Sequence, residues 1–188
     1  RDALDAYQSS LKIFAEIGGA QNEAILYLNI GCVYDYKGSY EEALAAYRRA
    51  LSIFREIGDL PNQADVLNDT GAIYRKAECY DEALLHHEQA RLIAEEIGNQ
   101  SQQVVALRGI ADVHRSSGRY NEALGKYRAV LRLAREIGDP YEEAKSSKGS
   151  RKRRSAPGAP MPRGLSSGRR WTSSSASACP RRSRHGYV

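Results

Sequence analysis

The chain has few of the residues expected of a metal site or a disulfide framework, and it lacks the long apolar run of a membrane span. It has three cysteines in 188 residues, Cys32, Cys79 and Cys179, and their spacing fits neither paired disulfides nor a zinc site. No apolar run approaches the roughly 20 residues of a membrane span, and we expect no signal peptide. These absences predict a cytoplasmic protein with no metal, no cofactor and no membrane partner.

Acidic residues are absent from the last part of the chain. Residues 146–188 contain 11 of the 28 Lys and Arg but none of the 23 Asp and Glu. Residues 1–145 therefore hold 17 basic and 23 acidic side chains, a net charge of −6, although the whole chain has a formal net charge of +5. Nucleic-acid binding needs basic residues gathered on a folded face, so residues 1–145 are not expected to bind nucleic acid.

What the sequence has in abundance is a 40-residue repeat. The triplet Glu-Ile-Gly begins at positions 16, 56, 96 and 136, and a fixed period of this size is typical of a solenoid. Apolar residues recur every three or four positions, which predicts two antiparallel amphipathic helices per unit, at about 22–37 and 40–57 in the first full unit. We expect an all-α array over 1–145: a partial unit 1–18, full units at about 19–58, 59–98 and 99–138, and the start of another at 139–145.

Glycine positions predict close packing and turns. Gly31 and Gly71 lie in the middle of a helix, where glycine costs about 1 kcal/mol of helix propensity relative to alanine, so another helix is expected to approach there. The glycines at 18, 58, 98 and 138 are expected to end the second helix of each unit in the left-handed conformation. Glu78 replaces the turn glycine of the second unit, which predicts a weaker turn.

Two adjacent histidines, His86 and His87, raise the question of a metal site. Neighbouring residues of a helix point about 100° apart, and the i, i+4 spacing of paired ligands is missing. His87 occupies the position held by Tyr47 and Tyr127 in the other units, so we expect it to be a packing residue. His114 also takes a tyrosine position and is interpreted in the same way.

These residues resemble a known family. The series that carries the resemblance is Gly31, Tyr34, Gly38, Tyr40, Ala43, Leu44, Tyr47 and Ala50. It is similar to the tetratricopeptide repeat (TPR) signature in its 40-residue form, and the match covers residues 1 to about 145. It resembles most the arrays attached to bacterial antibiotic-regulatory transcription factors and to signalling ATPases. The resemblance implies a right-handed TPR superhelix that binds protein and has no catalytic activity of its own.

In TPR folds the first helix of each unit lines the concave side, so the resemblance also implies a partner-binding groove. Side chains of Asn, Arg and Lys there would hydrogen-bond a peptide backbone or a carboxylate, and Leu28 and Tyr36 would offer apolar contacts. The predicted groove residues are Leu28, Asn29, Asp35, Tyr36, Asn68, Asp69, Arg75, Lys76, Arg108, Asp112 and Arg115.

The repeat pattern stops at Ser146, and two interpretations of residues 146–188 remain open. The segment is rich in Ser, Arg, Pro and Gly without helical periodicity, which is typical of a disordered basic tail. Alternatively, it is the translation of a further repeat in a shifted reading frame. In the shifted frame positions 147–151 can read Leu-x-Gly-Ile-Ala, matching residues 107–111. A genuine tail would bind nucleic acid nonspecifically, whereas a frameshifted one would have no evolved function.

The function predicted from the sequence is a noncatalytic scaffold that binds a peptide or protein partner in the concave groove, as a fragment of a larger bacterial regulator. No nucleophile–base pair, glycine-rich phosphate loop or paired carboxylate motif is present to suggest an enzyme. Two alternatives are a partner-binding segment of an ATPase or enzyme whose catalytic domain lies elsewhere, and nucleic-acid binding through the basic tail. Uncapped ends of the array would also permit self-association.

Overall fold

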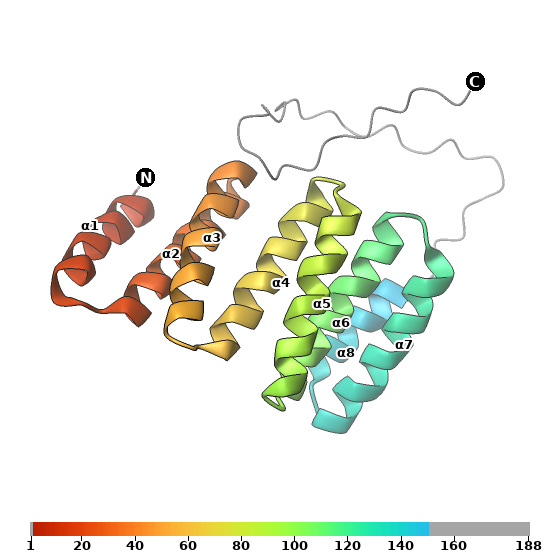
Figure 1. Ribbon diagram of the computed structural model, residues 1–188. Helices are drawn as coiled ribbons and strands as arrows, with labels where there is room; N and C mark the ends of the chain where they lie inside the picture. The colour runs from red at the N-terminus through yellow and green to blue at the C-terminus, as the bar shows by residue number, and fades with distance from the viewer. Residues whose placement is uncertain (1, 151–188) are drawn as a thin grey trace, which may run out of the picture.

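A computed structural model of the protein describes residues 2–150, and these form eight α-helices joined by short turns (Figure 1). The helices are α1 (Asp2–Ile17), α2 (Ala20–Tyr36), α3 (Tyr40–Glu56), α4 (Leu60–Lys76), α5 (Tyr80–Glu96), α6 (Gln100–Ser116), α7 (Tyr120–Ile137) and α8 (Pro140–Ser150). Within residues 2–150 there is no strand, so the predicted all-α class is confirmed. None of these helices combines the length and apolar character that crossing a bilayer requires.

The helices stack side by side in chain order as antiparallel pairs (Figure 1). The most extensive contacts join α2 to α3, α4 to α5 and α6 to α7, which are the predicted pairs of the three full units. Each even-numbered helix from α2 to α8 also contacts the odd-numbered helix before it. In addition, α4 contacts α6 and α6 contacts α8. The even-numbered helices therefore approach one another along one side of the stack, as expected of the inner layer of a curved solenoid.

Buried small residues allow the helices of a pair to approach closely. Ala43 and Ala83 are fully buried at equivalent positions, and Ala123 is 3% exposed. The predicted close approach at the helix glycines is present, because a Cβ added to Gly71 would lie 2.9 Å from Cδ2 of His87. Gly31 abuts the Tyr47 ring in the same way. In these two units the ring on the second helix of a pair thus lies against the glycine backbone of the first helix.

The turns repeat with the same geometry in successive units. Gly38 has φ +73°, its N–H donates to the Asp35 carbonyl at 2.9 Å, and the Ser39 N–H donates to the Tyr34 carbonyl at 2.9 Å. The glycines at 18, 58, 98 and 138 are also left-handed, as predicted. Glu78 adopts φ +63° and keeps the pattern, with its N–H donating to the Arg75 carbonyl at 3.1 Å. The turn is therefore retained, and the cost of having glutamate in place of glycine is backbone strain.

Helix α8 continues past the position at which the sequence pattern suggested a break. The helix extends to Ser150, so residues 146–150 are helical rather than part of a disordered tail. Ser146 is fully buried, and Gly149 lies against the Tyr127 ring. The next position, 151, has the register of Gly31 and Gly71 but holds arginine. Residues 151–188 lie outside the described residues, so both interpretations of the tail remain predictions.

Candidate partner-binding groove

The predicted groove residues all lie on the even-numbered helices α2, α4 and α6, but their surroundings differ widely. Tyr36, the last residue of α2, is 93% exposed. Leu28 is half-buried and packs against the hydrophobic core. The prediction that Asn68 faces a partner is wrong, because Asn68 is only 6% exposed. The inner layer thus mixes residues available to a partner with residues that hold the fold.

Polar side chains of the groove connect neighbouring even-numbered helices. Between α2 and α4, Nζ of Lys76 lies 2.7 Å from both carboxylate oxygens of Asp35. Between α4 and α6, Nε2 of Gln102 donates to Oδ1 of Asp65 at 2.8 Å. Between α6 and α8, Nε of Arg108 donates to Oε2 of Glu142 at 2.6 Å. These contacts fix the spacing of the inner helices, and they occupy three of the predicted groove residues.

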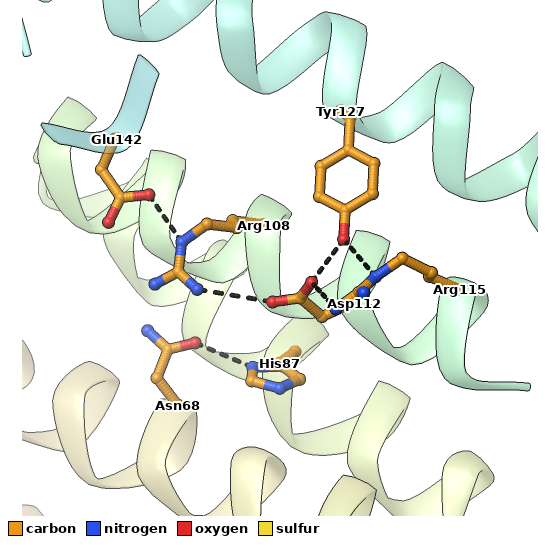
Figure 2. Close-up of polar contacts among 7 residues, drawn as sticks. All are labelled: Asn68, His87, Arg108, Asp112, Arg115, Tyr127 and Glu142. Atoms are coloured by element: carbon orange, nitrogen blue, oxygen red, sulfur yellow. Dashed lines mark hydrogen bonds and ion pairs between the residues drawn. The ribbon is translucent and has the colours of Figure 1, made fainter. Parts of the chain in front are cut away.

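The third unit contains a continuous polar network (Figure 2). The Asp112 carboxylate accepts from the Tyr127 hydroxyl and pairs with Arg115 at 3.1 Å and with Arg108 at 3.5 Å. Nε of Arg115 also donates to the Tyr127 hydroxyl at 3.0 Å. Burial, followed by the hydrogen bond to Asp112, raises the pKa of Tyr127 to about 12, so its hydroxyl stays protonated at neutral pH.

The environment of Glu142 was not predicted from the sequence. Only 3% of Glu142 is exposed, because it is enclosed against Arg108. Its backbone N–H is also capped by Oδ1 of Asp139 at 2.9 Å. The repeats gave no signal for this pair, because the equivalent positions hold Asn68 with Gln102 and Leu28 with Asn62.

The side chains of three predicted groove residues on α2 and α4 make no hydrogen bond or ion pair with any residue of 2–150. These are Asn29, Asp69 and Arg75, and each is half-buried. Burial, followed by repulsion from Asp65 and Asp35, raises the pKa of Asp69 to about 6, with Lys76 opposing the shift. The polar atoms of these three side chains are not among the buried groups left without a hydrogen-bond partner, so they reach solvent. Their role in a groove stays a prediction.

A cavity of about 410 Å³ lies where the C-terminal end of α6, the N-terminal half of α7 and the end of α8 meet. Its lining includes Tyr120, Leu124 and Lys148, and sequence analysis did not predict it. At the equivalent place in the preceding units, helix residues Ile73 and Val113 are fully buried. The position equivalent to Ile73 and Val113, residue 153, lies outside the described residues.

His87 is a packing residue, as the sequence predicted, since it is only 4% exposed. His86, for which no packing role was predicted, stacks on Tyr74 with ring centroids 5.2 Å apart. Among residues 2–150 no group of three His, Cys, Asp or Glu side chains is placed to hold a metal ion.

Comparisons with known proteins agree with this geometry. A tetratricopeptide repeat family model matches residues 1–56 and 62–136. Comparison with curated protein sequences gives no match. Solved structures that resemble the chain include the N-terminal domain of stress-induced protein-1 from C. elegans, with a TM-score of 0.54 and 16% identity over 70% of this chain and 98% of that one.

Two further solved structures cover more of this chain but less of their own. BtubC from P. vanneervenii matches with a TM-score of 0.64 and 20% identity, over 84% of this chain and 62% of that one. A signal transduction ATPase with numerous domains (STAND) from Pyrococcus horikoshii, which has a tetratricopeptide repeat sensor, matches with a TM-score of 0.57 and 19% identity. That match covers 79% of this chain and 26% of the ATPase. With two family-model matches that together span most of its helical repeats, the chain belongs to the tetratricopeptide repeat family, whose members are in general noncatalytic protein–protein interaction scaffolds.

Proposed function

We propose that the chain binds an extended segment of a protein partner along the inner face formed by α2, α4 and α6. The observation that carries this proposal is the set of half-buried polar residues Asn29, Asp69 and Arg75, whose side chains have no hydrogen bond or ion pair within residues 2–150. An amide, a carboxylate and a guanidinium together match the donors and acceptors of a peptide backbone with charged side chains.

Arg75 is the residue on which we expect affinity to depend most. A guanidinium forms paired hydrogen bonds with a carboxylate, and truncating a buried charged contact usually costs at least tenfold in affinity. Lys76 and Arg108 contribute less, because each is already paired with a carboxylate of the chain, Asp35 or Glu142. Tyr36, which is almost fully exposed, supplies an aromatic anchor at one end of the inner face.

The proposal is tested with peptides selected from a randomised displayed library against the full chain, then synthesised and titrated by fluorescence anisotropy. We expect Arg75→Glu to weaken the selected peptides at least tenfold. Arg128→Glu is the matched control, because Arg128 is an exposed arginine on α7, outside the inner layer. Equal losses in both variants would indicate nonspecific charge attraction and would contradict a groove site.

The parent molecule is proposed to be a regulator in which this array senses or recruits a partner. The supporting observation is the likeness in fold to the tetratricopeptide repeat sensor of the STAND ATPase, of which the match covers 26%. The genomic sequence around the coding region tests this, since a regulator of this kind would encode a DNA-binding or nucleotide-binding domain in the same reading frame. A complete gene with repeats alone would contradict it.

A further inference from the structure

One aromatic position recurs in each full unit, and in the middle unit it holds a histidine. Tyr47, His87 and Tyr127 occupy this position on α3, α5 and α7. Tyr47 contacts Gly31 of the preceding helix, and Tyr127 contacts Gly149 of the following helix. His87 lies against glycines on both sides, Gly71 on α4 and Gly109 on α6, and a Cβ on either would collide with the imidazole. The titratable His87 ring therefore fills the contact between α4, α5 and α6. We call this contact, formed by His87, Gly71 and Gly109, the joint.

The hydrogen bonds of His87 suit the neutral imidazole only. Its Nδ1 lies 3.1 Å from Oδ1 of Asn68, while Nε2 is buried without a hydrogen-bond partner in residues 2–150 (Figure 2). In the neutral tautomer that donates from Nδ1 to Asn68, the bare Nε2 lone pair is the sole unsatisfied atom of the ring. After protonation Nε2 would carry an N–H without an acceptor, in a side chain that is 4% exposed.

The charges around His87 also oppose protonation. Arg75 on α4 and Arg108 on α6 repel a second cation, and so does His86 on α5, whereas Asp112 on α6 attracts it. The attraction is divided, because Asp112 already accepts from Tyr127 and pairs with both Arg108 and Arg115. Burial is the largest cause that lowers the pKa of His87, to about 4, and Arg75 is the next.

We propose that His87 makes the joint between α4, α5 and α6 acid-labile, so that its protonation separates these helices and disrupts the inner face at Asn68 and Arg108. The stability of the joint rests on the geometry of the ring between two glycines. The consequence for partner binding additionally rests on the proposed function. In this position the tyrosines of α3 and α7 do not titrate in the same range, so the acid response is confined to the middle of the array.

The direction of the pH effect follows from linkage. The folded-state pKa of His87 is below the ordinary histidine value of 6.5, so the unfolded chain binds more protons as the pH falls. The stabilising contribution is complete above pH 6.5 and is lost as the pH falls toward 4. For this group the folding equilibrium constant should decrease by roughly 20-fold between pH 7 and pH 5. Asp69 acts in the opposite direction, so the wild-type curve alone does not isolate His87.

The test compares urea unfolding of the full chain at pH 7 and pH 5 in the wild type and in His87→Gln. The folding constant of the wild type divided by that of His87→Gln should decrease roughly 20-fold from pH 7 to pH 5, because the wild type loses more stability on acidification. His87→Tyr, which restores the residue of the other two units, is the second variant should His87→Gln be poorly folded. His114→Gln is the matched control, because His114 is another titratable ring on a neighbouring helix but is only half-buried.

A local readout distinguishes an opened joint from general destabilisation. Amide hydrogen exchange, corrected for the pH dependence of the intrinsic rate, should show protection lost in α5 and α6 before α2 and α3 as the pH falls. The His87 variants should lose this order. Equal acid sensitivity in the wild type, His87→Gln and His87→Tyr would overturn the proposal. Because no partner is present in either experiment, their outcome is independent of whether Arg75→Glu weakens peptide binding.

Discussion

At the scale of single residues, the second unit differs from the others because its turn has a glutamate where theirs have a glycine. Glycine adopts the left-handed conformation without a penalty, whereas for other residues it costs about 1–2 kcal/mol. Glu78 holds this conformation at φ +63°, while the equivalent Gly38 and Gly118 have φ +73° and +79°. The turn hydrogen bonds are kept, so the cost is carried by the Glu78 backbone.

We therefore predict that Glu78→Gly stabilises the protein by about 1 kcal/mol in urea unfolding. Gly118→Ala is the control at an equivalent turn. It should destabilise by a similar amount, because nothing lies within 4 Å of the added Cβ and backbone strain is the only cost. A loss of stability in Glu78→Gly would show that the glutamate side chain stabilises the turn by a contact that outweighs its conformation.

The glycines of the helix interiors should respond in opposite ways to alanine. Gly109→Ala places a Cβ against the His87 ring and should destabilise by about 1–3 kcal/mol. Gly125→Ala on α7 meets nothing within 4 Å and should stabilise by roughly 0.5–1 kcal/mol through helix propensity. Both values come from thermal or urea unfolding, and equal effects would contradict the close approach of α6 to α5.

Asp69 gives a second pH-dependent prediction, with the opposite sign to that of His87. Its folded-state pKa of about 6 is above the ordinary value of 3.8, so its contribution to stability is lost as the pH rises through 6. Asp69→Asn should raise the free energy of unfolding at pH 8 by up to about 3 kcal/mol, and by less at pH 5. An equal gain at the two pH values would mean that the carboxylate is not penalised by burial.

At the scale of elements, one buried ion pair joins α8 to α6. Glu142 contacts Arg108 on α6 and is 3% exposed, whereas its neighbour Glu143 pairs with Arg135 near the surface. Removing one partner of a buried pair leaves the other uncompensated, which costs about 3–5 kcal/mol. An exposed pair contributes about 0–1 kcal/mol.

Glu142→Gln should accordingly increase hydrogen exchange through α8, residues 140–150, and Glu143→Gln should leave it nearly unchanged. The measurement is hydrogen exchange followed by mass spectrometry on the full chain. Comparable exchange in the two variants would show that α8 is held by its apolar and glycine contacts with α7 instead.

The sequence predicted the helices well because the repeat imposes one pattern on every unit. It identified His87 as a packing residue from its register with Tyr47 and Tyr127. It did not identify the second glycine row, Gly109 and Gly149, because the first two units hold Asn29 and Asp69 at that register. Side chains that face inward also cannot be separated from those that face a partner by register alone, which is why Asn68 was expected to be exposed.

At the scale of the whole molecule, the inner layer has two parts of different character. The charged side chains on α6 and α8 are taken up by internal pairs, whereas α2 and α4 share one such pair, Asp35–Lys76, and keep the side chains of Asn29, Asp69 and Arg75 without partners in residues 2–150. A ligand that bound α6 would have to displace Glu142 or Asp112, which already compensate Arg108 and Arg115. We therefore expect a partner to contact α2 and α4 more than α6.

Binding of a partner to the inner face can be followed by amide chemical-shift mapping of the full chain with a library-selected peptide. We expect the largest shift changes on inner residues of α2 and α4, around Asn29, Asp69 and Arg75, with smaller changes on α6. Changes concentrated on the outer faces of α3, α5 and α7 would contradict this expectation, because the inner layer would then not be the binding surface.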